Sequence, residues 1–244
     1  MGSQEATSVA AIELLSERIA QVRERIARAA SRAGRDPAEV TLVAVTKSFP
    51  AEVVRGAIDC GLTVFGENRV QEARAKIPLL SRPGLSWHLV GPLQRNKVKH
   101  CFDLFDLIHS VDSVALAEEI ERRAAAKDEA MDVLIEVNAA GEASKFGVAP
   151  DEAPALARAV GRLERVRLRG LMTMPPLVAE PEANRAHFRA LRLLRDEIGR
   201  AGLEGVDMEH LSMGMTGDFE VAIEEGATIV RIGTALFGPR ETHR

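Results

Sequence analysis

Apolar residues gather in eight short runs along the chain, and longer amphipathic segments separate these runs. Most runs are almost continuously apolar, which is typical of parallel strands whose two faces are both covered. The pattern therefore predicts eight parallel strands. They are expected at residues 41–47, 63–68, 86–91, 107–112, 132–138, 168–174, 209–215 and 228–238.

Helical spacing of apolar residues fills the segments between the predicted strands. An amphipathic helix over residues 10–33 precedes the first strand, with Ile12, Leu15 and Ile19 three or four positions apart. No helical segment follows the last strand. The remaining helices are expected at residues 51–60, 70–80, 95–101, 114–127, 153–162, 181–201 and 218–225.

Eight strands that alternate with helices predict a single (β/α)8 barrel of the α/β class, with the N-terminal helix as an addition. This helix is expected to cover the barrel wall beside the last strand. An open, doubly wound sheet is the alternative fold, although no GxGxxG motif follows the first strand. We expect a disordered tail at residues 1–8, the barrel at residues 9–239 and a C-terminal tail at residues 240–244.

Composition narrows the classes of function. With 46% hydrophobic and 28% charged residues the chain is typical of a globular protein, and its net charge of −4 gives no broad basic surface for nucleic acid. No run approaches the roughly 20 apolar residues of a membrane span, and the N-terminus has no secretion signal, so a cytoplasmic protein without membrane contact is expected. Cys60 and Cys101 are too few for a disulfide framework or a zinc site and are interpreted as reduced, buried thiols.

Lys47 stands at the end of the first predicted strand, where barrels of this kind gather their functional side chains. A partly desolvated lysine keeps some neutral amine at pH 7 and can condense with an aldehyde or ketone. An ordinary surface lysine at a strand end is the alternative interpretation of this position.

Small and hydroxyl residues cluster after the seventh and eighth strands, where such barrels commonly hold phosphate through backbone amides. Ser212, Gly214 and Thr216 form one cluster, and Gly233 with Thr234 forms the other. Glycines that only make turns would explain either cluster alone, so the presence of both favours a phosphate site.

Arg231 comes just before the second cluster, and strand alternation directs it into the barrel. A buried arginine there needs a partner, which is either a structural ion pair or a ring nitrogen or carboxylate of a ligand. His88 in the third strand is interpreted as a hydrogen-bonded core residue rather than an acid or base. Met172 and Met174 fit core packing or an apolar wall, and no group of residues has metal-ligand spacing.

A lysine, a phosphate site and an inward arginine together suit a phosphorylated carbonyl compound bound as a Schiff base. Pyridoxal 5′-phosphate combines an aldehyde, a phosphate and a pyridine nitrogen, which need three separate anchors. A Schiff-base aldolase that acts on a sugar phosphate would use similar residues, so the pattern alone leaves both open.

Seven motifs extend this pattern over residues 12–238. They are LVAVTKSFP (42–50), FGENRVQEA (65–73), WHLVGPLQRNKVK (87–99), HSVDS (109–113), GEASKFGV (141–148), LRGLMTMPP (168–176) and LSMGMTGDFEVAIEEGATIVRIGTALFG (211–238). In this order they resemble the pyridoxal phosphate homeostasis family. The resemblance implies a fold-type III barrel, similar to the N-terminal domain of alanine racemase but lacking the second domain.

The resemblance also assigns roles to individual residues. It implies that Lys47 forms the Schiff base with pyridoxal phosphate, and that Arg231 faces the pyridine nitrogen and keeps it unprotonated. Asn68 and Met213 fall in motifs near the cofactor, and Lys145 matches a family lysine implicated in cofactor transfer, although an exposed loop lysine is the plainer interpretation. The phosphate is expected at Ser212, Gly214, Gly233 and Thr234.

Two functions are compatible with these residues. The first is a protein of intracellular pyridoxal phosphate homeostasis that stores, buffers or delivers the cofactor to apo-enzymes, without dedicated catalysis. The second is a pyridoxal phosphate-dependent amino-acid racemase or a related fold-type III enzyme. An alanine-type racemase takes its second base, a tyrosine, from the additional domain, and this sequence has 0 Tyr. The first function is therefore favoured, and a monomer is expected because that domain forms the racemase dimer.

Two departures from the family pattern qualify the resemblance. Thr216 stands where serine is usual, which keeps the hydroxyl. The tail PRETHR lacks a pair of lysines seen in some members, which puts in doubt a second cofactor site there.

Overall fold

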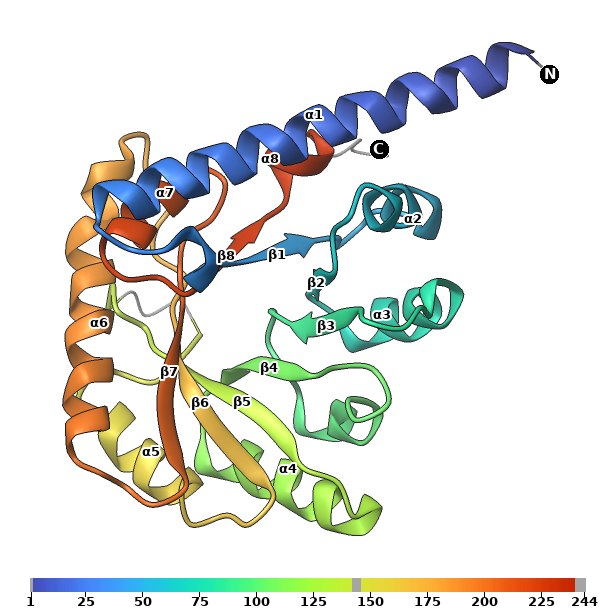
Figure 1. Ribbon diagram of the computed structural model, residues 1–244. Coiled ribbons are helices and arrows are strands. Elements are labelled where there is room, and N and C mark those ends of the chain that lie inside the picture. The colour runs from blue at the N-terminus through green and yellow to red at the C-terminus, as the bar shows by residue number, and fades with distance from the viewer. Residues whose placement is uncertain (1, 142–145, 240–244) are drawn as a thin grey trace.

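Eight parallel strands close into a barrel in chain order, with β1 paired to β8 (Figure 1). The computed structural model describes residues 2–141 and 146–239, with side chains from Ala10 onward. The closed order confirms the predicted (β/α)8 barrel and excludes the open sheet. The strands are β1 (Thr41–Val45), β2 (Val64–Glu67), β3 (Ser86–Leu89), β4 (Leu107–Val111), β5 (Met131–Glu136), β6 (Val166–Met172), β7 (Val206–Ser212) and β8 (Ile229–Ile232).

Helices surround the strands and follow the predicted segments closely. Two segments differ from the prediction. Residues 95–101 form a 3-10 helix, in which Val98 is the buried residue among exposed basic neighbours. The run 228–238 is not one strand, because β8 ends at Ile232 and a short helix follows Gly233, so the eighth helix is present. The helices are α2 (Ala51–Asp59), α3 (Val70–Lys76), α4 (Val114–Lys127), α5 (Ala153–Val160), α6 (Arg185–Arg200), α7 (Phe219–Glu224) and α8 (Thr234–Phe237), with 3-10 turns η1 (Pro37–Glu39), η2 (Ile77–Leu80), η3 (Arg95–His100) and η4 (Pro181–Asn184).

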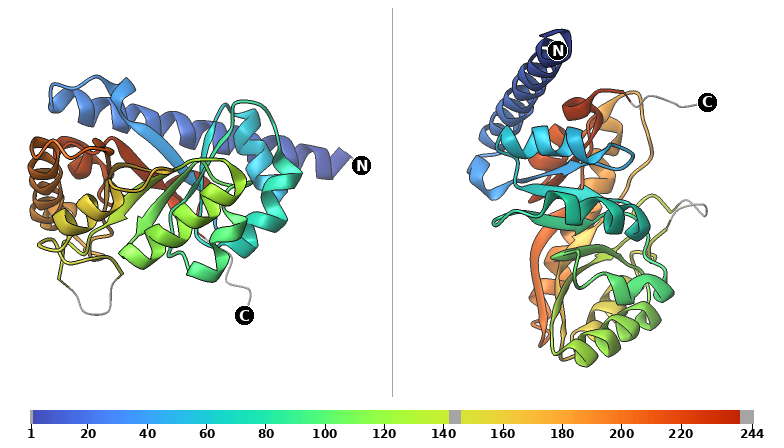
Figure 2. Two further views of the ribbon diagram at one scale, coloured as in Figure 1. Left: turned by 90° about the horizontal axis from the view of Figure 1, so that it is seen from below. Right: turned by 90° about the vertical axis from the view of Figure 1, so that its right-hand side faces the viewer.

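The first helix, α1 (Gly2–Arg32), crosses the outside of the barrel over α7, α8 and α2 (Figure 1). Its apolar stripe is buried there, including Leu15, Val22 and Ile26, whereas Ile12 is 43% exposed. This position beside β8 confirms the predicted one. The helix begins at Gly2, eight residues before its predicted start at residue 10, and its N-terminal end extends past the barrel (Figure 2). The predicted division into tails and barrel stays a prediction.

Apolar side chains form one layer outside the strands and a second, smaller layer inside the barrel. The larger layer lies between strands and helices and contains the stacked rings of Phe65 and Trp87. The smaller layer fills the inside of the barrel, and polar side chains lie above it, towards the carboxyl ends of the strands. The inner layer consists of Val43, Val45, Val90, Leu107, Leu134, Met172 and Ile229.

Local signals in the sequence act as expected. The Ser113 hydroxyl accepts a hydrogen bond from the Leu116 N–H at 3.4 Å and caps α4. Gly61 follows α2 with a φ of 82°, which suits a glycine at a helix end. Cys60 and Cys101 are free thiols, and Cys101 is buried as expected, whereas the expectation is wrong for Cys60, which is half-buried at the end of α2. Among the described residues, no helix is long and apolar enough to cross a membrane.

Candidate functional site

Lys47 and Arg231 come from adjacent strands of the barrel. Lys47 follows the end of β1 by two residues and is half-buried. Val43 and Val45 point into the barrel, and the same alternation carried on to position 47 directs the lysine to the inner side. In the ladder between β1 and β8, Val43 lies opposite Arg231. Lys47 comes four residues after Val43, so the lysine lies two inward-facing positions nearer the mouth than the arginine.

Arg231 is buried inside the barrel, as strand alternation predicts, with 4% of its surface exposed. Its Nη1 donates to Ser212 Oγ at 2.5 Å, and its Nη2 donates to the carbonyl oxygen of Thr173 at 2.9 Å. Burial lowers its pKa to about 10, while Glu136 and Asp218 act in the opposite direction as charges. Arg231 thus stays cationic at neutral pH, with neutral hydrogen-bond partners.

His109 continues this chain of contacts across the barrel. Its Nδ1 lies 2.9 Å from Ser212 Oγ, and its Nε2 lies 3.0 Å from His88 Nδ1. Burial lowers the pKa of His88 to about 4 and that of His109 well below its ordinary value. Both rings are therefore neutral at pH 7, and the hydrogen-bonded core interpretation of His88 is confirmed. We call His88, His109, Ser212 and Arg231 the inner polar line.

Proton positions along the inner polar line are restricted by the arginine. A guanidinium can only donate, so Ser212 Oγ accepts from Arg231 and has its own proton free to donate to His109 Nδ1. His109 then carries its proton on Nε2 and donates it to His88. This arrangement satisfies every member with neutral histidines and keeps positive charge on Arg231 alone.

Glu136 at the end of β5 also lies near the arginine. It is 5% exposed, and burial raises its pKa to about 7, with the charge of Arg231 acting against this. Neither Glu136 nor His109 was among the residues predicted for the site. Each is a fully or almost fully buried polar residue near the carboxyl end of a largely apolar strand, and that interruption was the available signal.

The two clusters predicted to hold phosphate lie side by side. The Arg231 N–H donates to the Gly214 carbonyl at 3.0 Å, and the Ala235 N–H donates to Thr216 Oγ1 at 3.3 Å. Gly233 is half-buried and Thr234 is exposed at the start of α8. These loops bring two threonine hydroxyls and backbone amides together, a donor set that fits an anion. Ser212 differs, because its hydroxyl is buried in the inner polar line.

Gly214 lies against the beginning of α7. Its φ is 92°, and a Cβ there would lie 2.6 Å from the Cβ of Ala222 and 2.9 Å from the Cα of Phe219. Asp218 fixes the same loop, since its Oδ1 accepts from the Met215 N–H at 2.7 Å. Glycine is thus required by the close approach of the loop to α7.

The remaining predicted residues are placed less directly. Met213 is fully buried after β7, and Asn68 is half-buried after β2. Gly91 lets Asn68 approach, because a Cβ at Gly91 would lie 2.4 Å from the Asn68 carbonyl oxygen. Lys145 lies outside the described residues, so its predicted role stays a prediction.

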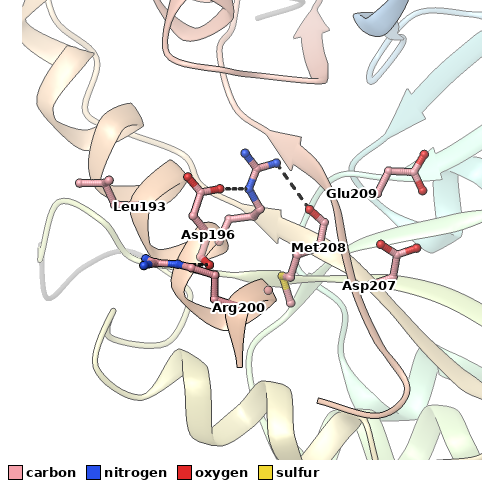
Figure 3. A pocket seen from close by; sticks show the side chains of 8 residues that line it. Leu193, Asp196, Arg200, Asp207, Met208 and Glu209 are labelled. Atoms are coloured by element: carbon pink, nitrogen blue, oxygen red, sulfur yellow. Dashed lines mark hydrogen bonds and ion pairs between the residues drawn. The ribbon is translucent and has the colours of Figure 1, made fainter. Parts of the chain in front are cut away.

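A shallow hollow of about 770 Å³ lies elsewhere, between α6 and the first half of β7 (Figure 3). Arg195 is among its lining residues, with Nε donating to Asp196 Oδ1 at 2.6 Å. Asp207, Met208 and Glu209 line one side, whereas Ser212 ends the same strand, so the hollow is separate from the mouth. Among the described residues, no group of three or more histidine, cysteine and acidic side chains is arranged to hold a metal.

The chain matches one family and is similar to several curated proteins that share one name. The family described as alanine racemase, N-terminal domain, matches residues 18–241. A pyridoxal phosphate homeostasis protein of Aquifex aeolicus is 50% identical over 225 residues, which cover 92% of this chain and 98% of the relative. A protein of the same name from Pseudomonas aeruginosa is 47% identical and is covered to 96%.

Solved structures have the same barrel. PipY of Synechococcus elongatus PCC7942, solved with PLP bound, superposes with a TM-score of 0.79 at 37% identity, and covers 92% of this chain and 100% of its own. An alanine racemase of Clostridium difficile gives a TM-score of 0.71 at 15% identity, over 95% of this chain and 58% of its own. The second likeness concerns the fold alone.

Proposed function

The chain belongs to the pyridoxal phosphate homeostasis proteins within the alanine racemase N-terminal domain family, and we propose that it binds pyridoxal 5′-phosphate (PLP) through Lys47. It holds PLP as a Schiff base and stores, buffers or delivers it within the cytoplasm, as a monomer, to apo-enzymes that need it. It has no dedicated catalysis. The observation that carries the proposal is the half-buried Lys47, two inward-facing positions nearer the barrel mouth than the cationic Arg231 on the adjacent strand.

Three groups of residues fit the three parts of PLP. When bound, the cofactor supplies an aldehyde whose carbon bonds to the Lys47 nitrogen, with the carbonyl oxygen leaving as water. Arg231 stays charged because its pKa is about 10, and a guanidinium donates without accepting. A ring nitrogen set against Arg231 therefore stays unprotonated. Hydroxyls and amides at Gly214, Thr216, Gly233 and Thr234 bind the phosphate, and Ser212 contributes by holding Arg231.

An unprotonated ring nitrogen favours a protein that binds PLP over an enzyme that uses PLP to convert an amino acid. Without a proton on that nitrogen the ring withdraws electrons weakly, which disfavours removal of a proton from a bound amino acid. A two-base racemase also needs a second group on the opposite face, and the sequence has 0 Tyr for that role. The relatives' names likewise describe homeostasis.

Borohydride trapping tests the Schiff base. The purified protein is expected to absorb near the visible region with PLP, and reduction is expected to fix the cofactor on Lys47, as shown by mass spectrometry of the labelled peptide. Lys47→Ala should lose the absorption band and the label, whereas Lys127→Ala, which changes a lysine paired with Asp103 on the surface, should keep both. Protein that stays colourless with added PLP would overturn the proposal.

Turnover separates a carrier from an enzyme. The PLP-loaded protein is incubated with a panel of L-amino acids and the loss of optical activity is followed. Racemisation at ordinary enzymatic rates would reject the carrier. Transfer of PLP to an apo-enzyme faster than PLP is released into solution is the expected result.

A further inference from the structure

Lys76 is a buried lysine on α3 that the proposed function does not use. It is 6% exposed, and its ammonium donates three hydrogen bonds. The acceptors are Glu67 Oε1 at 2.7 Å, Glu72 Oε1 at 2.8 Å and the carbonyl oxygen of Thr46 at 2.8 Å. All three N–H groups are thus used, which is what a buried ammonium needs.

The same two carboxylates bind the backbone and side chain next to Lys47. Glu67 Oε1 also accepts from the Thr46 hydroxyl at 2.6 Å, and Glu72 Oε1 accepts from the Ser48 N–H at 2.5 Å. The cluster of Lys76, Glu67 and Glu72 therefore fixes the residue before Lys47 at two points and the residue after it at one.

Ser48 has a backbone conformation that must be held in place. Its φ is 68°, in the left-handed region that few residues other than glycine adopt. Among the described residues, Asp128 is the other non-glycine residue with a positive φ, and it ends α4, where this conformation is common. Ser48 ends no helix; its turn is held by the hydrogen bond from its own N–H to Glu72 and by the one from the Phe49 N–H to the Thr46 carbonyl at 3.1 Å.

Burial of the charged cluster lowers the stability of the fold. Glu67 is fully buried and its pKa is raised by burial, against the effects of Lys76 and Thr46. Its second oxygen, Oε2, has no hydrogen-bond partner among the described residues. Buried groups left partly unsatisfied are uncommon and point to a demand other than stability.

We propose that Lys76 is a positioning residue for Lys47. Through Glu67, Glu72 and the Thr46 carbonyl it holds the turn at residues 46–48, so that the Lys47 amine is set at the barrel mouth for an incoming aldehyde. This inference rests on the proposed Schiff base at Lys47.

The test compares three lysine variants. Lys76→Met removes the ammonium, and Lys76→Met with Glu67→Gln removes both charges, so that no uncompensated buried carboxylate threatens the fold. Lys127→Met is the matched control, because its ammonium pairs with Asp103 away from the turn. Two quantities are measured: the rate constant for Schiff-base formation after PLP is added, and hydrogen–deuterium exchange of the Ser48 amide in ligand-free protein.

Both Lys76 variants are expected to slow Schiff-base formation by up to about hundredfold, because a reacting group misplaced by about 1 Å can cost that much in rate. Exchange at Ser48 is expected to quicken in both, and Lys127→Met should change neither quantity. At position 72, Glu72→Gln keeps an acceptor oxygen for the Ser48 N–H and should retain slow exchange, whereas Glu72→Ala should lose it.

Two outcomes overturn the inference and are distinct from failure of the proposed function. If the folded double variant forms the Schiff base with the wild-type rate constant, Lys76 has a structural role alone. If exchange at Ser48 is unchanged in both Lys76 variants, the cluster does not hold the turn. If the wild type forms no Schiff base, the proposed function fails and this inference, which rests on it, fails too.

Discussion

Arg231→Met removes the guanidinium of a residue that is 4% exposed and keeps an unbranched apolar side chain, two heavy atoms shorter. Burial lowers the arginine pKa from 12.5 to about 10, which corresponds to about 3 kcal/mol against the charged form in the folded protein. The substitution recovers this free energy and loses hydrogen bonds from the charged guanidinium to Ser212 Oγ, which keeps His109 as a partner, and to the Thr173 carbonyl, about 1.5 kcal/mol each at the lower end for a charged donor. We expect the free energy of unfolding to stay within about 1 kcal/mol of the wild type.

Glu136 does not reverse this expectation. The charge of Arg231 lowers the pKa of Glu136, which is about 7 in the wild type. Without the arginine the pKa rises further, so the carboxyl is protonated at neutral pH. Glu136 is then not a buried, unpaired charge, which is the usual reason why removing one member of a buried pair is costly.

Urea unfolding of the ligand-free protein at pH 7 measures the difference, with fluorescence of Trp87, the 1 Trp of the sequence, as the probe. Arg185→Met is the control: Arg185 binds Glu182, Glu224 and Glu225, and Arg189 still pairs with the buried Glu225, so its loss should cost about 1 kcal/mol. A loss of about 3 kcal/mol or more in Arg231→Met would refute the reasoning, since it would mean that the guanidinium stabilises the ligand-free fold.

Three further outcomes are expected. Glu136→Gln should become more stable relative to the wild type as pH rises from 4.5 through 7, by up to about 3 kcal/mol. The reason is that a carboxyl whose pKa is raised to about 7 in the fold contributes stability at low pH and loses that contribution as pH rises through 7. Urea unfolding at a series of pH values checks this. Gly214→Ala should lose about 2–4 kcal/mol and weaken PLP binding, measured by thermal unfolding and titration, since its Cβ would lie 2.6 Å from Ala222. Ser113→Ala should lose about 1 kcal/mol by urea unfolding, through loss of a helix cap.

The fold was predictable because each strand is a compact apolar run, bounded by polar residues or glycine. The run 228–238 shows the limit of that signal. Its apolar residues continue past Ile232, but Gly233 ends the strand and Leu236 is buried from a short helix. A buried strand and a buried helical turn look alike over four residues, so their boundary depends on packing.

Site residues were predictable where position along one strand decides them. Lys47 and Arg231 follow from strand ends and alternation, and Arg231 is buried inside the barrel as expected. The partners of Arg231 were not predictable, since Thr173 lies 58 positions away and the contact depends on closure of the barrel. Lys76 was missed for a related reason, because nothing on α3 alone shows that its ammonium reaches Thr46.

Two buried cations lie on the two sides of β1, and their surroundings differ in a way that bears on a ligand. Lys76, on the outer side, has its charge matched by Glu67 and Glu72, so it secures backbone. Arg231, on the inner side, has neutral partners and keeps a charge that burial disfavours. A group that accepts a hydrogen bond from Arg231 would recover part of that cost on binding. Loss of Arg231 should therefore leave the stability of the ligand-free protein nearly unchanged and lower the affinity for PLP. In the wild type, PLP at 100 times Kd stabilises the fold by about 2.7 kcal/mol. In Arg231→Met the stabilisation at the same PLP concentration should be smaller.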